Sequence, residues 1–373
     1  MKQGKELRRA VISLCEKTGK SILKLTEQDY KENGMDDVLE GYDGAEAVNM
    51  DVFYQLQHTI TGWPGGKPDA DDTHRPERAL PFPKRVVVFS PHPDDDVISM
   101  GGTIRKLVKQ GHDLHVVYQT SGNIAVGNDD VMHYMHFMNG FNELFSGNKD
   151  EVITDKYKEI KDFINSGVAN ENNHTRDLLT VKGLIRRGEA RMASAYNGIS
   201  KDHIHFLDMP FYESGKVEKL PISAADIKII KDLLAEVKPH QVFCAGDLAD
   251  PHGTHRKCTE AVFAALNELF QEGADWLQDL NVWLYRGAWA EWDLADIDMA
   301  VPMSPKNVID KRNSILRHHS QMEGAPYKGD DQRLFWQRAE DRNRNTAMLY
   351  DQLGFTSYEA MEAFVKWHPD TIV

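Results

Sequence analysis

The chain has 373 residues, of which 41% are hydrophobic and 27% charged, enough for one large folded domain with an appendage. Its formal net charge of −14 argues against a nucleic-acid-binding protein, because no long stretch dense in lysine and arginine supplies a basic face. An acidic chain can still bind an anionic substrate, since a pocket needs only two or three cations. We therefore expect a small-molecule partner and no nucleic acid.

Neither a membrane nor an export signal is indicated. The longest apolar runs, such as residues 86–89, are far too short to cross a bilayer. Charges are scattered through residues 1–20, which lack the apolar region of a signal peptide. Cys15, Cys244 and Cys258 are widely spaced and form neither a disulfide framework nor a CxxC zinc pair. We expect a protein of the cytoplasm with no membrane partner.

The first part of the chain differs from the rest in its composition and hydrophobic pattern. Residues 5–60 carry apolar side chains at helical spacing. Residues 61–84 are rich in proline, glycine and aspartate and show no periodicity. We predict a helical N-terminal extension over 1–60, a linker over 61–84 and the main domain over 85–373.

The main domain alternates between strand and helix patterns. RVVVFS at 85–90 is short, β-branched and continuously apolar, which is typical of a parallel strand covered on both faces. A helical pattern and a second strand, LHVVYQ, complete a βαβ unit. Further strands are predicted at 203–209, 240–246 and 281–289, with helices at 223–237 and 261–270 and mostly helical structure after 306. The pattern predicts an α/β fold with a Rossmann-like, mostly parallel sheet and helices on both faces.

The segment Ser90-Pro-His-Pro-Asp-Asp-Asp96 follows the first strand directly. Ligands of open α/β sheets collect at the carboxyl ends of strands. The prolines on either side of His92 stiffen the backbone, and an imidazole beside carboxylates offers metal ligands and a general base. Asp94–Asp96 could instead cap the next helix, but capping requires neither His92 nor its prolines.

A second polar segment, ADPHGTHR at 249–256, follows the strand predicted at 240–246. His252 and His255 share one face if they open a helix. A pair of surface histidines is the competing interpretation, since the chain has sixteen. Two His/Asp clusters at two strand ends favour a metal site, and three protein ligands with a water are usual for catalytic zinc.

Four motifs in order carry a family resemblance: HPDD at 92–95 with GGTI at 101–104, RRGE at 186–189, the HxxH element at 252–255, and Lys311 followed by HHSQ at 318–321. Over roughly residues 84–325 the chain resembles the LmbE/PIG-L family of zinc-dependent N-acetylglucosamine deacetylases. The resemblance implies an LmbE-like fold, a Zn²⁺ cofactor and hydrolysis of an acetamide.

The resemblance also implies roles for five residues. His92, Asp95 and His255 match the zinc ligands. Asp94 matches the general base that activates water. His252 matches the residue that stabilises the oxyanion or protonates the departing amine.

Two further positions match residues at the substrate. Arg186 corresponds to a substrate contact and His318 to a residue near the pocket rim. Arg187 and Arg191 are further candidate cations, although a solvated helix face explains at least two of the three arginines. Asp96 departs from the family, which usually has Glu there, and this puts in question the contact that the longer side chain makes.

The whole chain is also similar to the C-terminal half of long bacterial proteins assigned as glucosamine-6-phosphate deaminases, with residues 1–60 resembling the tail of the deaminase half. We therefore rank an N-acetylglucosamine-type deacetylase first, its sugar being free, phosphorylated or conjugated. A zinc amidase for another acyl amide comes second. A glucosamine-6-phosphate deaminase-related protein and a non-catalytic sugar-binding domain follow. A homo-oligomer is left open.

Other reactive or aromatic residues have plainer interpretations. Ser121 and Cys258 lie in no known nucleophile motif, so we expect Ser121 to line the pocket or close a strand and Cys258 to pack. Trp283, Trp289 and Trp292 follow one another near a strand and could stack on a sugar, but tryptophan more often fills a core.

Overall fold

The computed structural model describes residues 2–69, 80–145, 150–169, 173–214, 219–246, 253–287, 290–322 and 333–367. Seven strands in these ranges form one sheet in the order β3-β2-β1-β4-β5-β7-β6. The strands are β1 (Arg85–Ser90), β2 (Asp113–Tyr118), β3 (Ile204–Phe206), β4 (Gln241–Ala245), β5 (Asn281–Tyr285), β6 (Met299–Met303) and β7 (Ala360–Lys366). β1 to β5 are parallel, as the sequence predicts, and β7 runs antiparallel to both of its neighbours.

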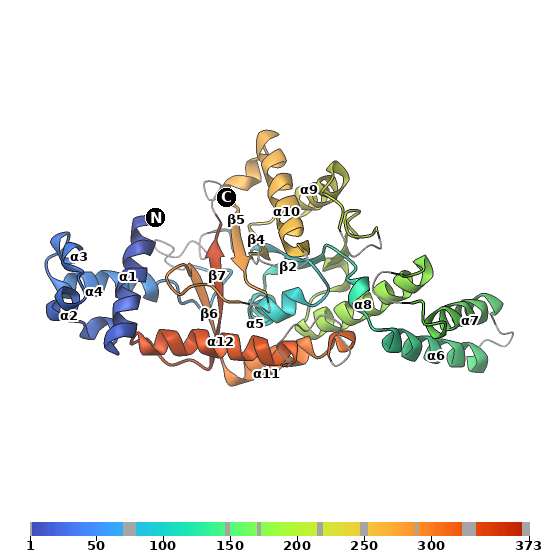
Figure 1. Ribbon diagram of the computed structural model, residues 1–373. Coiled ribbons are helices and arrows are strands. Elements are labelled where there is room, and N and C mark those ends of the chain that lie inside the picture. Colours follow the sequence, from blue (N-terminus) through green and yellow to red (C-terminus); the bar gives the residue numbers. More distant parts are fainter. Residues whose placement is uncertain are drawn as a thin grey trace.

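Helices cover both faces of the sheet, which confirms the predicted fold class (Figure 1). Val87 and Val117 point toward α9 (Ala224–Val237) and α10 (Thr254–Gln271). Val86 and Val116, one residue earlier on the same strands, point to the other face and pack with α5 (Asp95–Lys109) and α8 (Arg176–Asn197). Burial of alternate residues on both faces accounts for the continuous apolar runs of β1 and β2.

The face carrying α5 is thickened by two C-terminal helices, α11 (Pro305–Ile315) and α12 (Phe335–Gln352). Val97 of α5, Ala193 of α8, Ile315 of α11 and Ala339 of α12 meet in one small core. α12 runs as a long horizontal rod below the sheet in Figure 1. The predominance of helix after residue 306 agrees with the prediction, whereas the strand β7 was not anticipated.

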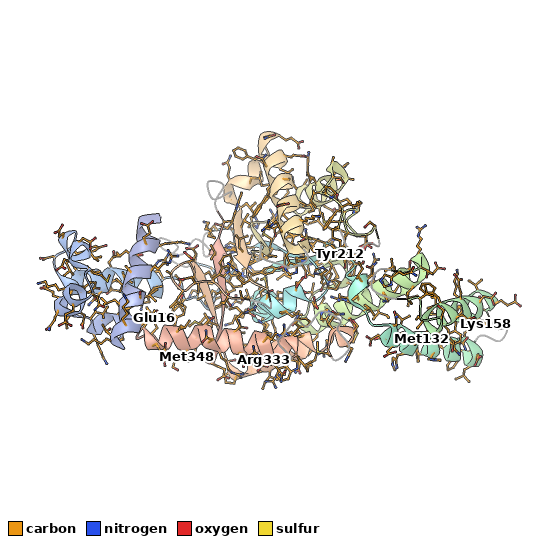
Figure 2. The ribbon with its side chains drawn as sticks, viewed as in Figure 1. Glu16, Met132, Lys158, Tyr212, Arg333 and Met348 are labelled. Atoms are coloured by element: carbon orange, nitrogen blue, oxygen red, sulfur yellow. The ribbon has the colours of Figure 1, made fainter. Side chains whose placement is uncertain are left out.

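A helical hairpin, α6 (Asn128–Phe145) and α7 (Glu151–Asn165), projects from α8 at one end of the molecule (Figure 1). Met132 and Lys158, labelled in Figure 2, mark this hairpin. Val131 and Ile160 join Leu178 of α8 in a separate core. The hairpin therefore packs on α8 and makes no strand contact through this core.

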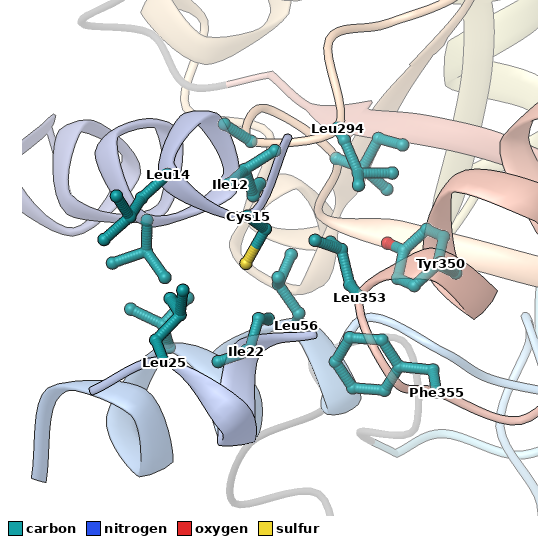
Figure 3. Close-up of a cluster of buried hydrophobic side chains, with 14 of the residues drawn as sticks. Ile12, Leu14, Cys15, Ile22, Leu25, Leu56, Leu294, Tyr350, Leu353 and Phe355 are labelled. Atoms are coloured by element: carbon teal, nitrogen blue, oxygen red, sulfur yellow. The ribbon is translucent and has the colours of Figure 1, made fainter. Parts of the chain in front are cut away.

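The N-terminal segment is helical, as predicted: α1 (Lys2–Thr18), α2 (Glu27–Glu32), α3 (Asp36–Glu40) and α4 (Ala45–Gln57). Its apolar side chains pack against the C-terminal part of the chain (Figure 3). Leu14, Cys15 and Leu56 meet Tyr350 and Phe355 in a single buried cluster. Short 3-10 helices lie at Ile22–Lys24, Asn123–Ala125, Lys201–His203, Asp275–Asp279 and His319–Gln321.

The described ends of the predicted linker, residues 61–84, contact the main domain. The Thr61 amide donates to the Ala300 carbonyl at 2.9 Å. The Lys84 ammonium is buried and donates to the Gly65 carbonyl at 3.0 Å. The three-part division of the chain stays a prediction.

Within the described ranges, no helix combines the length and apolar character needed to cross a membrane.

The GGTI motif is explained by close packing inside α5. A Cβ on Gly102 would lie 2.3 Å from the Met303 sulfur, so a side chain at this position would force the Met303 side chain of β6 to move. The amides of Gly102 and Thr103 both donate to the carboxylate of Glu362 on β7, at 2.9 and 2.6 Å. Lys311 of α11 donates to the same carboxylate at 2.7 Å. Helix α5 is thus tied to β7 and α11 through one buried carboxylate.

The Lys311–Glu362 pair is fully buried, with side-chain exposures of 1% and 0%. We expect Lys311→Met to lower the free energy of unfolding by about 3–5 kcal/mol, because it leaves Glu362 as an unpaired buried charge. Lys306→Met is a matched control on the same helix, since Lys306 is 73% exposed and pairs with Asp310 at 3.0 Å. Its loss should stay within about 1 kcal/mol. Denaturant unfolding of both variants checks this, and equal losses would contradict it.

Candidate metal centre at the carboxyl end of the sheet

The strand order places a crevice at the end of β1. β1 lies between β2 and β4, and the chain leaves β1 toward β2 but leaves β4 toward β5. Connections that diverge in this way open a crevice at the carboxyl ends of the two central strands. The segment His92–Asp95 follows β1, and His255 lies in the first turn of α10 after β4. Both predicted clusters therefore end at the same place.

Three of the predicted ligands converge. The Asp95 Oδ2 atom lies 3.1 Å from His92 Nδ1 and 3.2 Å from His255 Nε2. One donor atom from each of the three side chains lies within 4.8 Å of the others. The imidazole rings of His92 and His255 are 5.3 Å apart between centroids. One carboxylate oxygen between two imidazole nitrogens is a suitable donor set for a divalent metal.

The local charges support this arrangement. Burial acts to raise the pKa of Asp95, but the adjacent His255 and His92 outweigh it and hold that pKa well below its usual value. Burial lowers the pKa of His92, which favours the neutral imidazole despite the neighbouring Asp95. An ionised carboxylate and neutral imidazoles are the protonation states that bind a metal.

Asp94 occupies the N-cap position of α5, but its side chain makes no capping hydrogen bond. Its φ angle of 133° is unusual for a residue with a Cβ. The carboxylate instead lies 3.3 Å from the guanidinium of Arg186, which also donates to the Pro93 carbonyl. Burial raises the pKa of Asp94 well above its usual value, and Arg186 opposes that rise. The capping interpretation therefore does not account for Asp94.

Asp96, where the family usually has Glu, is enclosed by two hydroxyl groups. Ser90 Oγ and Tyr118 OH lie 3.3 and 3.2 Å from its carboxylate oxygens, and the Asp96 amide lies 3.0 Å from Ser90 Oγ. Burial raises the pKa of Asp96 to about 6. The shorter side chain thus reaches hydrogen-bond partners on both carboxylate oxygens, behind the candidate metal centre.

The three candidate arginines separate clearly. Arg186 is 1% exposed and reaches Asp94. Arg187 pairs with Asp208 and lies over the ring of Phe206, and Arg191 lies over the same ring. Only Arg186 of these three contacts the predicted site, in agreement with the expectation that at least two serve the helix surface.

The HHSQ segment is attached to α8 by Glu189. The Ser320 amide and hydroxyl donate to the two Glu189 oxygens at 2.7 and 2.8 Å. His318, placed near the pocket rim by the resemblance, is fully buried, and neither ring nitrogen has a hydrogen-bond partner among the described residues. Burial, with a smaller effect of Arg186, lowers the pKa of His318 to about 3.

Tyr212 and Glu213 were not anticipated from the sequence. Tyr212, labelled in the central part of Figure 2, places its ring edge-on to His92 at a centroid distance of 5.8 Å. Glu213 accepts from the Ser121 amide and hydroxyl at 3.0 and 3.1 Å. Both follow β3 in an irregular segment without a motif, so no sequence signal identifies them. Ser121 follows the end of β2 and is held there by these hydrogen bonds, in agreement with the expectation that it closes a strand.

The remaining candidates are mostly structural. Cys258 is fully buried in the core beneath α10, as expected. Trp283 is also fully buried, so it fills the core and cannot stack on a sugar. Trp292 packs against the N-terminal core and donates to the Leu284 carbonyl at 3.2 Å. His252 and Trp289 lie outside the described residues.

Residues 87–266 match the PIG-L family model, described as GlcNAc-PI de-N-acetylase. A glucosamine-6-phosphate deaminase-like protein of Bacteroides thetaiotaomicron is 63% identical over 365 residues, which cover 98% of this chain and 55% of that protein. A diacetylchitobiose deacetylase of Thermococcus kodakarensis is 26% identical over 168 residues, 44% of this chain and 59% of that protein. The chain therefore spans little more than half the length of these relatives.

A solved structure, the N,N'-diacetylchitobiose deacetylase from Pyrococcus horikoshii, is 21% identical and superposes with a TM-score of 0.46. The match covers 76% of this chain and 84% of that one.

The buried His318 predicts a specific pH dependence. Its pKa of about 3 lies below the ordinary 6.5, so between these values the unfolded chain binds a proton that the folded chain does not. Its contribution to stability is therefore lost as the pH falls below about 6.5, with a slope of up to about 1.4 kcal/mol per pH unit. We expect His318→Gln to flatten the curve of unfolding free energy between pH 7 and 5.

The adjacent, exposed His319 offers the control. His319→Gln should keep the wild-type slope in denaturant unfolding of the metal-stripped protein. Equal slopes for the two variants would show that burial of His318 does not set this dependence.

Proposed function

We propose that this chain, whose residues 87–266 form a PIG-L family domain, is a zinc-dependent hydrolase that removes the N-acetyl group from an N-acetylglucosamine-type sugar. The observation that carries the proposal is the convergence of His92, Asp95 and His255 beside the buried Asp94. The relative named diacetylchitobiose deacetylase supports an acetamide substrate. The products would be acetate and an amino sugar.

The donor set fits zinc. Two imidazoles and one carboxylate are common protein ligands in catalytic zinc sites, which keep a further position for water or substrate. His92, Asp95 and His255 would hold the ion, with the His92 amide also donating to Asp95 Oδ2 at 2.9 Å and fixing that carboxylate. When bound, zinc would polarise the acetamide carbonyl and lower the pKa of a water from about 15.7 to about 7.

Asp94 is the proposed general base. Its raised pKa suits a carboxylate that must take a proton from the attacking water near neutral pH. Arg186, which contacts both Asp94 and the Pro93 carbonyl, fixes the carboxylate beside the ligands. Hydroxide adds to the carbonyl carbon, the carbon–nitrogen bond breaks, and the proton passes to the departing amine. His252, outside the described residues, is proposed to stabilise the oxyanion or supply that proton.

A further candidate, ranked after a zinc amidase for another acyl amide, comes from the relative at 63% identity, which is named glucosamine-6-phosphate deaminase-like. Deamination would release ammonia, whereas deacetylation releases acetate, so the two reactions are separated by their products. That relative is nearly twice as long as this chain, which aligns with 55% of it. We rank deacetylation first because the convergence of His92, Asp95 and His255 beside Asp94 suits amide hydrolysis. A zinc amidase for another acyl group stands between the two.

We expect Asp94→Asn to lower the rate of acetate release by about 10²–10⁴-fold, because the amide cannot accept the proton. The zinc content should not change, since Asp94 is not a proposed ligand. Asp208→Asn is the matched control, because Asp208 is paired with Arg187 on the surface of α8, and it should retain activity. Full activity in Asp94→Asn would remove Asp94 from the mechanism.

Substrate and metal are tested together by an acetate-release screen over N-acetyl sugars, each with and without a 6-phosphate. We expect activity to disappear after chelation and to return with added Zn²⁺. Ammonia is measured in the same reactions. Ammonia release without acetate would replace the proposal by the deaminase-related candidate. Acetate release that resists chelation would exclude a metal requirement.

A further inference from the structure

A second group of histidines lies away from the candidate metal centre, on the edge of the sheet. Asp113 and His115 are alternate residues of β2, His205 lies in β3, and His203 is the last residue of the 3-10 helix that directly precedes β3. Alternate residues of a strand point to the same face, so Asp113 and His115 lie on one face of β2. The pairing of Val117 with His205 in the β2–β3 register brings the two pairs together.

The side chains are in mutual contact. The Asp113 Oδ1 atom lies 3.2 Å from His203 Nδ1 and 3.6 Å from His115 Nε2. The rings of His115 and His203 are stacked with centroids 4.1 Å apart. One donor atom of each of these three residues lies within 4.8 Å of the others. His115 Nδ1, on the other side of its ring, lies 3.0 Å from His205 Nε2.

We propose that Asp113, His115 and His203 bind a second divalent transition-metal ion of the Zn²⁺ type. One carboxylate and two imidazoles suit Zn²⁺ better than the oxygen-preferring Mg²⁺ or Ca²⁺. The side chains of Asp113 and His203 are 43% and 35% exposed, so the ion can enter from solvent and keep water in its remaining positions.

The contact between His115 and His205 fits metal binding at His115. A metal on Nε2 requires the proton of the neutral ring to sit on Nδ1, which is the nitrogen that faces His205 Nε2. Ligating histidines commonly donate their second N–H to such a partner. Glu236 of α9 is the acidic neighbour of His205.

The location separates this cluster from the proposed reaction. Asp113 is the first residue of β2, and His203 directly precedes β3, whereas His92 and His255 follow the carboxyl ends of β1 and β4. β3 has three residues and lies at the edge of the sheet, paired only with β2 among the described strands. A metal between β2 and the residue before β3 would hold this short edge strand in place. The second ion is therefore structural.

Titration of the untagged, chelator-stripped chain with Zn²⁺ tests the proposal, with bound metal counted by mass spectrometry. We expect two equivalents in the unsubstituted chain and one in His203→Ala and in Asp113→Asn. Because their substitutions lie outside the proposed catalytic site, both variants should retain acetate release. His205→Ala should weaken the second site by about 10–100-fold, as expected for loss of an outer hydrogen-bond partner. His133→Ala, at an exposed histidine of α6, should leave both sites intact.

A variant that lacks two of the proposed catalytic ligands tests the second site independently. Asp95→Ala/His255→Ala should retain one equivalent, and adding His203→Ala should abolish it. If the Asp95→Ala/His255→Ala variant does not fold, the metal content of the unsubstituted chain is compared with that of His203→Ala and Asp113→Asn to test the second site. The proposal is overturned if the number of equivalents bound by the unsubstituted chain is unchanged in both His203→Ala and Asp113→Asn.

Discussion

Three consecutive carboxylates buried in one loop are the constraint on which the candidate metal centre depends. Unpaired, Asp94, Asp95 and Asp96 would repel one another and resist burial. The burial of each carboxylate is offset differently. Asp94 contacts the guanidinium of Arg186, and Asp95 contacts two imidazoles. Asp96 contacts two hydroxyl groups, and its pKa is raised. Neighbours in the sequence thereby acquire separate chemical properties. The proposed base, the proposed ligand and a residue that supports them are thus three copies of one amino acid.

Those partners come from distant parts of the chain, which explains why so much of the fold converges on this loop. Arg186 belongs to α8, and the same helix holds the HHSQ segment through Glu189 and Ser320. Helix α5, which begins inside the loop, is fixed from the opposite side by the buried Glu362 and Lys311. The loop is therefore supported from two directions by charged groups that water does not reach. Rigid support of this kind is what positions ligands before a metal arrives.

The parallel sheet and most of the site were predictable because their signals are local. Short apolar runs, β-branched in β1, identify the parallel strands, and polar residues directly after two of them identify the candidate site. Glu362 could not be predicted, because the sequence does not show which partners a charged residue in a strand will meet. Tyr212 and Glu213 belong to an irregular segment whose position depends on tertiary contacts alone. Trp283 was open to two interpretations, packing in the core and stacking on a sugar. Both faces of its strand are covered, so no alternation of polar and apolar residues shows which side chains face the core.

The N-terminal helices share a single core with α12 and β7, as Figure 3 shows through Leu14, Leu56, Tyr350 and Phe355. This has a consequence for how such proteins recombine. A genetic junction placed between these helices and the sheet would expose two apolar surfaces at once, one on each product. A junction ahead of α1 would leave the shared core whole. A fusion or fission boundary that keeps the N-terminal helices together with α12 and β7 preserves this shared core.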